Sequence, residues 1–243
     1  FFFAKKHFIA YNMIYGGDIL MLQNNLNRLM SERNIKTSDI SKDIGLAKTT
    51  ISSLSRGTTT GIQFDTLEKI CSYLQVTPAE FFDYSPYVLE TTTQLKLSDL
   101  KKGQFQYSAH ITNNVYSKEF KLNVKLLDPK SSTDFPRTDL NNYSLYLTID
   151  LVKDSKYSPE ELFGIIGSFP SILERKFYQQ LVDPIIDQLN LCTKKKLSLP
   201  VYATTDPNEI ILNKNEHCIF DIFKNTPCHK LIDLKLGTDD LTL

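Results

Sequence analysis

Short polar side chains dominate residues 47–57, where the only large apolar residues are Ile51 and Leu54. These two lie three positions apart, so on a helix they form one narrow stripe that packs inward. Because Ser and Thr are weak helix formers, the outward face is suited to a purpose other than helix stability. Hydroxyl and ammonium groups there can hydrogen-bond to base edges in the major groove of DNA. The residues on this face are Lys48, Thr49, Ser52 and Ser53.

Two His/Cys pairs, His217-Cys218 and Cys228-His229, are the other side chains with evident chemistry, because all four could bind zinc. The spacing is not that of a zinc finger, and adjacent ligands do not easily converge on one ion. Cys218 also alternates with apolar residues, which favours a core strand with histidines at its ends. We therefore expect no metal and no cofactor.

Two short helices and a tight turn must position the polar face. Thr37 supplies an N-cap hydroxyl to a helix predicted from Ser38 to Ile44, with Asp39 in its first turn. Gly45 follows, and glycine takes the positive φ that ends a helix without a steric penalty. Closely crossed helices need apolar residues and one small residue at their contact. The sequence supplies Ile40, Ser41, Ile44, Leu46, Ile51 and Leu54.

Further helices are predicted on both sides of this pair. A first helix runs from Met21 to a left-handed exit at Asn34. Its apolar residues recur at steps of three and four: Leu22, Leu26, Leu29 and Met30. Asp65 and Glu68 fit a capping box for a fourth helix, and Thr77 precedes a proline at the start of a fifth.

This pattern resembles the lambda-repressor-like, Cro-type (XRE) helix-turn-helix family, whose recognition helix commonly ends in a sequence like Ile-Ser-Ser-Leu-Ser-Arg-Gly at 51–57. The resemblance covers roughly Leu22 to Tyr84. It implies a compact all-α domain of five helices at residues 21–84, in which the loop after the recognition helix lies against the DNA backbone.

If the N-terminal half of that helix enters the major groove, Lys48, Thr49, Ser52 and Ser53 are expected to contact bases. Phosphate contacts are expected from the start of the preceding helix and from around the end of the recognition helix. The residues concerned are Thr37, Ser38, Thr50, Arg56, Thr58 and Thr59. Residues 21–84 contain seven bases and seven acids, so one copy should bind DNA weakly.

The composition of the chain sets few other limits. Its 243 residues contain 28 Lys+Arg and 28 Asp+Glu, so no overall charge indicates nucleic acid or membrane as a partner. The four cysteines are too few for a disulfide scaffold, and no apolar stretch is long enough to cross a membrane. We expect a cytoplasmic protein with reduced thiols.

The second half of the chain predicts an α+β domain at residues 99–243, after a linker at residues 85–98. Residues 104–111, 120–126 and 143–149 alternate as antiparallel strands do. Ser158 caps a short helix, and a longer helix spans 169–191 with Pro184 inside it. Shorter strands or irregular pieces are predicted at 199–203, 210–212, 218–223 and 230–236.

The first twenty residues have no clear period and open with Phe-Phe-Phe. We hypothesise that Met21 is the true start, because a purine-rich ribosome-binding site would translate as Gly16-Gly17-Asp18. The alternative is a short arm that packs on the body of the protein.

Together these patterns predict a transcriptional repressor of phage or mobile-element type that binds a two-fold DNA operator as a homodimer, with the second domain making the dimer contact. Two alternatives are a regulator whose second domain senses an effector or an antirepressor, and an interaction module whose helix-turn-helix binds no DNA. A self-cleaving serine–lysine peptidase would need an Ala-Gly or Cys-Gly site, and neither occurs. We expect no enzymatic activity.

Overall fold

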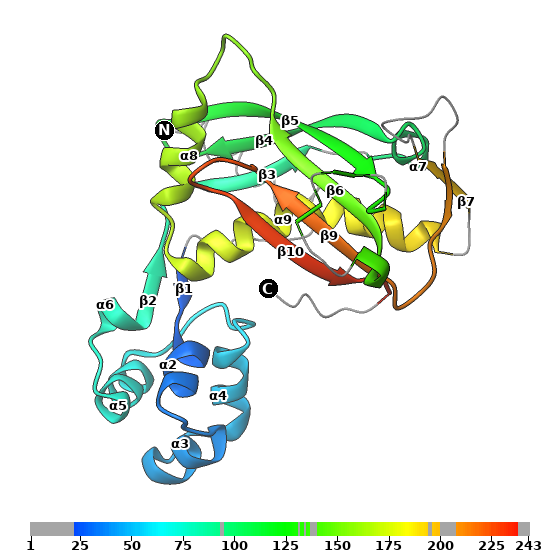
Figure 1. Ribbon diagram of the computed structural model, residues 1–243. Helices are drawn as coiled ribbons and strands as arrows, with labels where there is room; N and C mark the ends of the chain where they lie inside the picture. Colours follow the sequence, from blue (N-terminus) through cyan, green and yellow to red (C-terminus); the bar gives the residue numbers. More distant parts are fainter. Residues whose placement is uncertain are drawn as a thin grey trace. The chain divides into compact units, whose positions relative to one another are not determined.

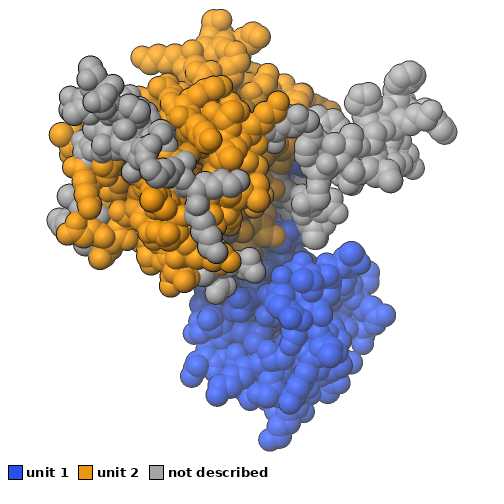
Figure 2. Space-filling view, turned by 90° about the vertical axis from the view of Figure 1, so that its right-hand side faces the viewer, with its two compact units in different colours: residues 1–88 blue, residues 89–243 orange. Residues whose placement is uncertain are grey.

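The computed structural model describes residues 22–92, 95–130, 132–133, 135–136, 140–193, 196–199 and 208–237. The chain divides into two compact units, the first ending at residue 88 and the second beginning at residue 89 (Figures 1 and 2). The upstream segment 1–20, Met21 and most of the strand predicted at 199–203 lie outside the described residues. None of the described helices is long and apolar enough to cross a membrane.

The first unit contains the five predicted helices. They are α2 (Leu26–Glu32), α3 (Thr37–Ile44), α4 (Lys48–Ser55), α5 (Phe64–Leu74) and α6 (Pro78–Phe81). One apolar core joins them, and its most deeply buried side chains are Leu26, Ile40, Ile51, Ile70 and Phe81. Asn34 has a φ of 53°, which confirms the left-handed exit predicted after the first helix.

The start of the first helix was predicted wrongly. Instead of a helix from Met21, residues Leu22–Asn24 form strand β1, which pairs antiparallel with β2 (Phe82–Tyr84). Leu22 is 50% exposed, so it takes no part in the apolar stripe of α2. The stripe is carried by Leu26, Leu29 and Met30 alone.

Two helix starts also differ from the predictions. Lys36, not Thr37, is the N-cap of α3, and its backbone N–H donates to Asp39 Oδ2 over 2.9 Å. Asp65 lies inside α5 and pairs with Lys69, so it caps nothing. The cap at Thr77 is confirmed, because its hydroxyl accepts from the backbone N–H of Glu80 over 3.3 Å.

The second unit is built on a six-stranded sheet of order β10-β9-β6-β5-β4-β3. Its strands are β3 (Val88–Thr92), β4 (Gln104–Thr112), β5 (Ser117–Leu127), β6 (Tyr143–Leu151), β9 (His217–Ile222) and β10 (Lys230–Lys235). The β6–β9 pair is parallel, whereas β4–β5, β5–β6 and β9–β10 are antiparallel. The smaller elements are the 3₁₀ turn η1 (Leu140–Asn142) and the hairpin of β7 (Lys196–Leu199) and β8 (Asn208–Ile211).

The two longer helices of this unit are α8 (Pro159–Gly167) and α9 (Ser171–Cys192), and α9 runs along one face of the sheet (Figure 1). Alternate residues of β4 are buried, and one of them, Tyr107, donates to the carbonyl of Leu181 on α9 over 2.8 Å. This unit therefore mixes a sheet with helices, as the α+β prediction required. The three predicted central strands and both predicted helices are present.

The segment predicted as a linker, residues 85–98, contains β3 and the first residues of α7 (Leu97–Leu100). Two buried leucines, Leu89 and Leu100, attach these elements to the second unit. Strand β3 forms one edge of the six-stranded sheet, beside β4.

Candidate DNA-binding surface

The turn between α3 and α4 depends on a glycine. Gly45 has a φ of 72°, a left-handed conformation in which other residues are strained. A Cβ there would meet nothing within 4 Å, so the requirement comes from the backbone conformation and not from crowding. The predicted turn is confirmed.

Helix α4 rests on the core through its two apolar residues. Ile51 is 0% and Leu54 3% exposed, and partly buried Ile44 and Leu46 pack against the same cluster. The stripe predicted from the sequence is thus the buried face of the helix. The other side chains of α4 are exposed or partly buried.

The four residues predicted to contact bases lie together on α4, but they are not equally exposed. Lys48 and Thr49 are exposed at the start of the helix, whereas Ser52 and Ser53 are partly buried. Within the described part of the chain Lys48 makes no ion pair or hydrogen bond, so its ammonium group can reach outward. The first turn of α4 is therefore its most exposed part.

The predicted phosphate contacts after α4 partly serve to end the helix. The Arg56 guanidinium donates through Nε to the carbonyl of Ser52 over 3.2 Å. Thr58 donates its hydroxyl proton to the carbonyl of Ser53, also over 3.2 Å. A phosphate oxygen can only accept, so Thr58 would have to release Ser53 to bind one. Exposed Thr50 and partly buried Thr59 are not tied in this way.

At the start of α3, a carboxylate already occupies the N-terminus. Asp39 accepts from the backbone of Lys36 over 2.9 Å and from the hydroxyl of Ser38 over 3.2 Å. Thr37 is partly buried. A phosphate at this end would therefore compete with Asp39 for the same donors.

Charge is not distributed evenly over the first unit. Residues 36–57 hold four bases, Lys36, Lys42, Lys48 and Arg56, against the acids Asp39 and Asp43, which gives a net charge of +2 (4 − 2). Ion pairs elsewhere join Arg28 to Glu32 and Lys69 to Asp65. The neutral domain thus carries its positive excess at the helix-turn-helix.

Comparison with known proteins agrees with this geometry. Residues 25–87 match the family of Cro/C1-type HTH DNA-binding domains. These residues form a Cro/C1-type DNA-binding domain. No curated protein matches the chain. A crystal structure of a candidate DNA-binding protein from Bacteroides fragilis matches with 21% identity over 26% of this chain and 100% of that one, with a TM-score of 0.25.

Sequence reasoning missed two residues that support α4 of the Cro/C1-type domain. Asn24 on β1 donates through Nδ2 to the carbonyl of Leu54 over 3.0 Å. Gln23 is 5% exposed, and its Oε1 lies 3.8 Å from the position a Cβ would take on Gly57. The run Gln-Asn-Asn at 23–25 interrupts the apolar spacing, and that interruption is the signal that could have shown them.

The two His/Cys pairs lie in the second unit, where both histidines contact aspartates. His229 Nε2 lies 2.7 Å from Asp221 Oδ1, and His217 Nδ1 lies 3.0 Å from Asp233 Oδ1. Cys218 is fully buried, and burial strongly raises the pKa of its thiol. Within the described residues no group of three His, Cys, Asp or Glu is placed to hold a metal.

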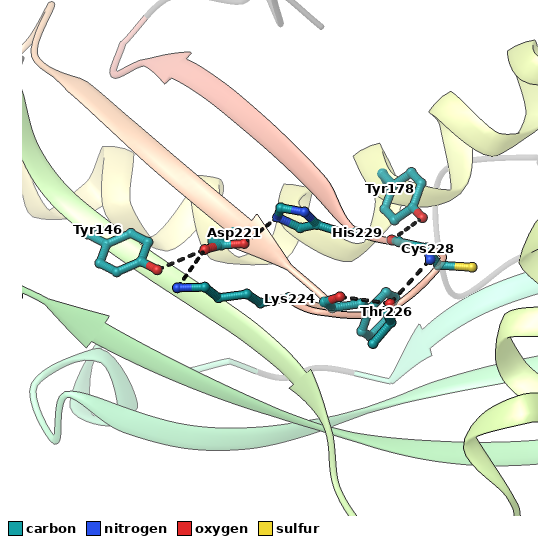
Figure 3. Close-up of polar contacts among 8 residues, drawn as sticks. Tyr146, Tyr178, Asp221, Lys224, Thr226, Cys228 and His229 are labelled. Atoms are coloured by element: carbon teal, nitrogen blue, oxygen red, sulfur yellow. Dashed lines mark hydrogen bonds and ion pairs between the residues drawn. The ribbon is translucent and has the colours of Figure 1, made fainter. Parts of the chain in front are cut away.

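Figure 3 shows the network around Asp221, which is 0% exposed. Its carboxylate accepts from Tyr146 over 2.8 Å, contacts His229 and lies 4.0 Å from the Lys224 ammonium. A buried carboxylate needs such partners, and this one is fully engaged by protein groups. The network holds together β6, β9 and the turn that leads to β10.

Proposed function

We propose that this protein is a sequence-specific transcriptional regulator, a repressor of phage or mobile-element type that binds a two-fold operator as a homodimer. The observation that carries this proposal is the exposed polar first turn of α4, mounted on the buried pair Ile51 and Leu54. A helix held this way can enter the major groove without disturbing its core. DNA-binding domains of this type are typical of regulators without enzymatic activity.

In this proposal Lys48 and Thr49 make the main base contacts, since both are exposed at the start of α4. A lysine can donate to guanine O6 or N7, and a threonine can hydrogen-bond or contact a thymine methyl. Ser52 and Ser53 are partly buried and would contact bases only where the groove closes around the helix.

Phosphate contacts would come from Thr37, Ser38, Thr50, Arg56, Thr58 and Thr59. Among these, exposed Thr50 and Arg56 carry most weight. Ser38 and Thr58 each donate their single hydroxyl proton to a protein acceptor, whereas the bond from Arg56 Nε to Ser52 uses one of the five guanidinium N–H groups. Such contacts set the register of the helix on the duplex and carry no sequence information by themselves.

Dimerisation is assigned to the second unit. The local charge of the helix-turn-helix is only +2 (4 − 2), so one copy would neutralise few phosphates and bind with low affinity. Two copies on half-sites one helical turn apart add their contacts. Repression then follows from occupancy of the operator.

The experiment is selection of bound duplexes from a random double-stranded library by the full chain, followed by mobility-shift titration of the enriched duplex. Lys48→Ala/Thr49→Ala is expected to abolish the shift while the unfolding midpoint stays unchanged. Lys69→Ala/Thr66→Ala is the matched control, because it removes the same residue types from α5. Failure to enrich any sequence would overturn the proposed function, and normal binding by the first double variant would overturn the assigned contacts.

A further inference from the structure

One side chain joins the first helix of the DNA-binding domain to the end of α4. Asn24 Oδ1 accepts from the backbone N–H of Leu26 over 3.2 Å, at the start of α2. Its Nδ2 donates to the carbonyl of Leu54 over 3.0 Å, in the last turn of α4. Thirty residues separate Asn24 from Leu54 in the sequence.

The primary amide of asparagine suits this position. A helix N-terminus presents N–H groups that need an acceptor, whereas a C-terminus presents carbonyls that need a donor. Asparagine offers one acceptor and one NH₂ group on a short stem, while aspartate offers acceptors only. An aspartate here could still cap α2, but it would face the Leu54 carbonyl without a proton to donate.

The bond from Asn24 is not needed to satisfy the end of α4. The Leu54 carbonyl also accepts from the backbone N–H of Gly57 over 2.9 Å. The second hydrogen bond to this carbonyl, from Asn24, therefore fixes where the end of α4 lies relative to β1. Gln23 adds a buried contact at the same place, next to Gly57.

Strand β1 is in turn held by the rest of the domain. It pairs with β2 through Leu22–Tyr84, Gln23–Asp83 and Asn24–Phe82. The following residue, Asn25, donates its backbone N–H to the carbonyl of Phe81 over 2.8 Å. The donor to Leu54 thus projects from a fixed backbone.

We propose that Asn24 is a positioning residue for sequence readout, which sets the angle of α4 against α2 and so the placement of Lys48 and Thr49 over base edges. This rests on the proposed function, because it concerns the same surface. A helix held only by Ile51 and Leu54 can rock about its apolar stripe. Base contacts suffer from such rocking more than phosphate contacts do, because they require directed hydrogen bonds.

The test compares Asn24→Asp with Asn25→Asp in the full chain. Asn25 is a matched control: it lies next in sequence, is 2% exposed, and its Nδ2 donates to a backbone carbonyl, that of Glu80, over 3.3 Å. Its bond links α2 to α6 and leaves α4 untouched. The measured quantity is the ratio of the Kd for a scrambled duplex to the Kd for the duplex selected by the wild-type chain.

For Asn24→Asp this ratio is expected to fall about tenfold, the effect of losing one hydrogen bond, while affinity for the scrambled duplex stays within about twofold. For Asn25→Asp the ratio should stay unchanged even where the unfolding midpoint falls. The pair Asn24→Ala and Asn25→Ala repeats the comparison without a new charge, in case either aspartate variant fails to fold.

An unchanged ratio in the folded Asn24 variants would overturn the proposal, as would an equal fall in the Asn25 variants, because stability alone would then explain the loss. If the wild-type chain selects no duplex at all, the proposed function itself has failed. The two failures are therefore distinguishable.

Discussion

The hydroxyl of Tyr146 donates a 2.8 Å hydrogen bond to Asp221, and both side chains are fully buried. The strands that carry them, β6 and β9, pair in parallel in the large sheet, whereas β4–β5, β5–β6 and β9–β10 are antiparallel. A second, partly exposed set repeats the pattern. Tyr143 donates to Asp233 over 2.6 Å, and His217 contacts the other oxygen of that carboxylate.

Replacing Tyr146 by Phe should destabilise the second unit by about 1 to 3 kcal/mol, because a buried carboxylate loses one of its donors. Tyr143→Phe is the control, since the side chain of Asp233 is 29% exposed and water can replace the lost bond. Urea unfolding followed by far-UV circular dichroism measures both. Equal losses in the two variants would show that burial of Asp221 does not govern the cost.

The sequence predicted those parts of the fold that depend on local patterns. Gly45, the stripe of Ile51 and Leu54, and the caps at Thr77 and Ser158 each depend on residues close in the chain, and the structure confirms them. The β1–β2 pair joins residues sixty positions apart, and local spacing carries no information about such a partner. Leu22 is spaced four residues before Leu26, as a helix would require, although it lies in β1.

The same reason explains which part of the site was missed. The exposed face of α4 follows from its own residue types, whereas the contact between Asn24 and Leu54 exists only after folding. The hydrogen bond from the Thr58 hydroxyl to the Ser53 carbonyl could not be predicted either, because it requires the left-handed turn at Gly57. Local sequence predicts which groups are polar but not which acceptors they meet.

Replacing Gly45 by Ala should lower stability by about 1 to 2 kcal/mol, the cost of a left-handed backbone with a Cβ. Because a Cβ there meets nothing within 4 Å, no steric cost adds to this figure. Gly45→Asn should cost less, since asparagine tolerates that conformation. Gly61→Ala serves as the control, because Gly61 has the same open surroundings and no positive φ. Thermal unfolding would contradict this account if all three variants behaved alike.

Asp183 on α9 should make stability depend on pH. Partial burial, and then the charge of Asp187 one turn away, raise the pKa of its carboxyl from 3.8 to about 6. The folded state binds the proton more tightly, so its stability falls as pH rises from about 4 to about 6 and stays low above that.

Asp183→Asn should therefore stabilise the protein at pH 7 and change little at pH 4. The gain is about 1 kcal/mol, a figure reduced from the full shift because solvent screens a partly exposed group. Asp187→Asn, at the exposed neighbour, should give a smaller gain. Denaturant midpoints at the two pH values measure the difference, and a gain of equal size at both would exclude titration of Asp183 as its cause.

Light scattering on the full chain should give twice its mass of 27.9 kDa at micromolar concentration, as the assignment of dimerisation to the second unit requires. Lys48→Ala/Thr49→Ala should leave that mass unchanged, because α4 lies in the DNA-binding domain. A monomer mass without DNA would remove dimerisation as the task of the second unit and favour the sensing of an effector or partner.

Arg56→Gln should separate phosphate contacts from base contacts. If Arg56 neutralises one phosphate, the slope of log K against log salt concentration should become shallower by about 1, with an equal loss of affinity on selected and scrambled duplexes. Arg56 is exposed, and the bond from its Nε to Ser52 holds the guanidinium at the end of α4. Arg28→Gln is the control, since Arg28 pairs with Glu32 on α2 and should leave the slope unaltered.

Lys48→Ala should instead weaken binding to the selected duplex more than binding to the scrambled one. A change in base preference with Arg56→Gln would mean that this residue reads sequence, and its assignment to the backbone would then be wrong.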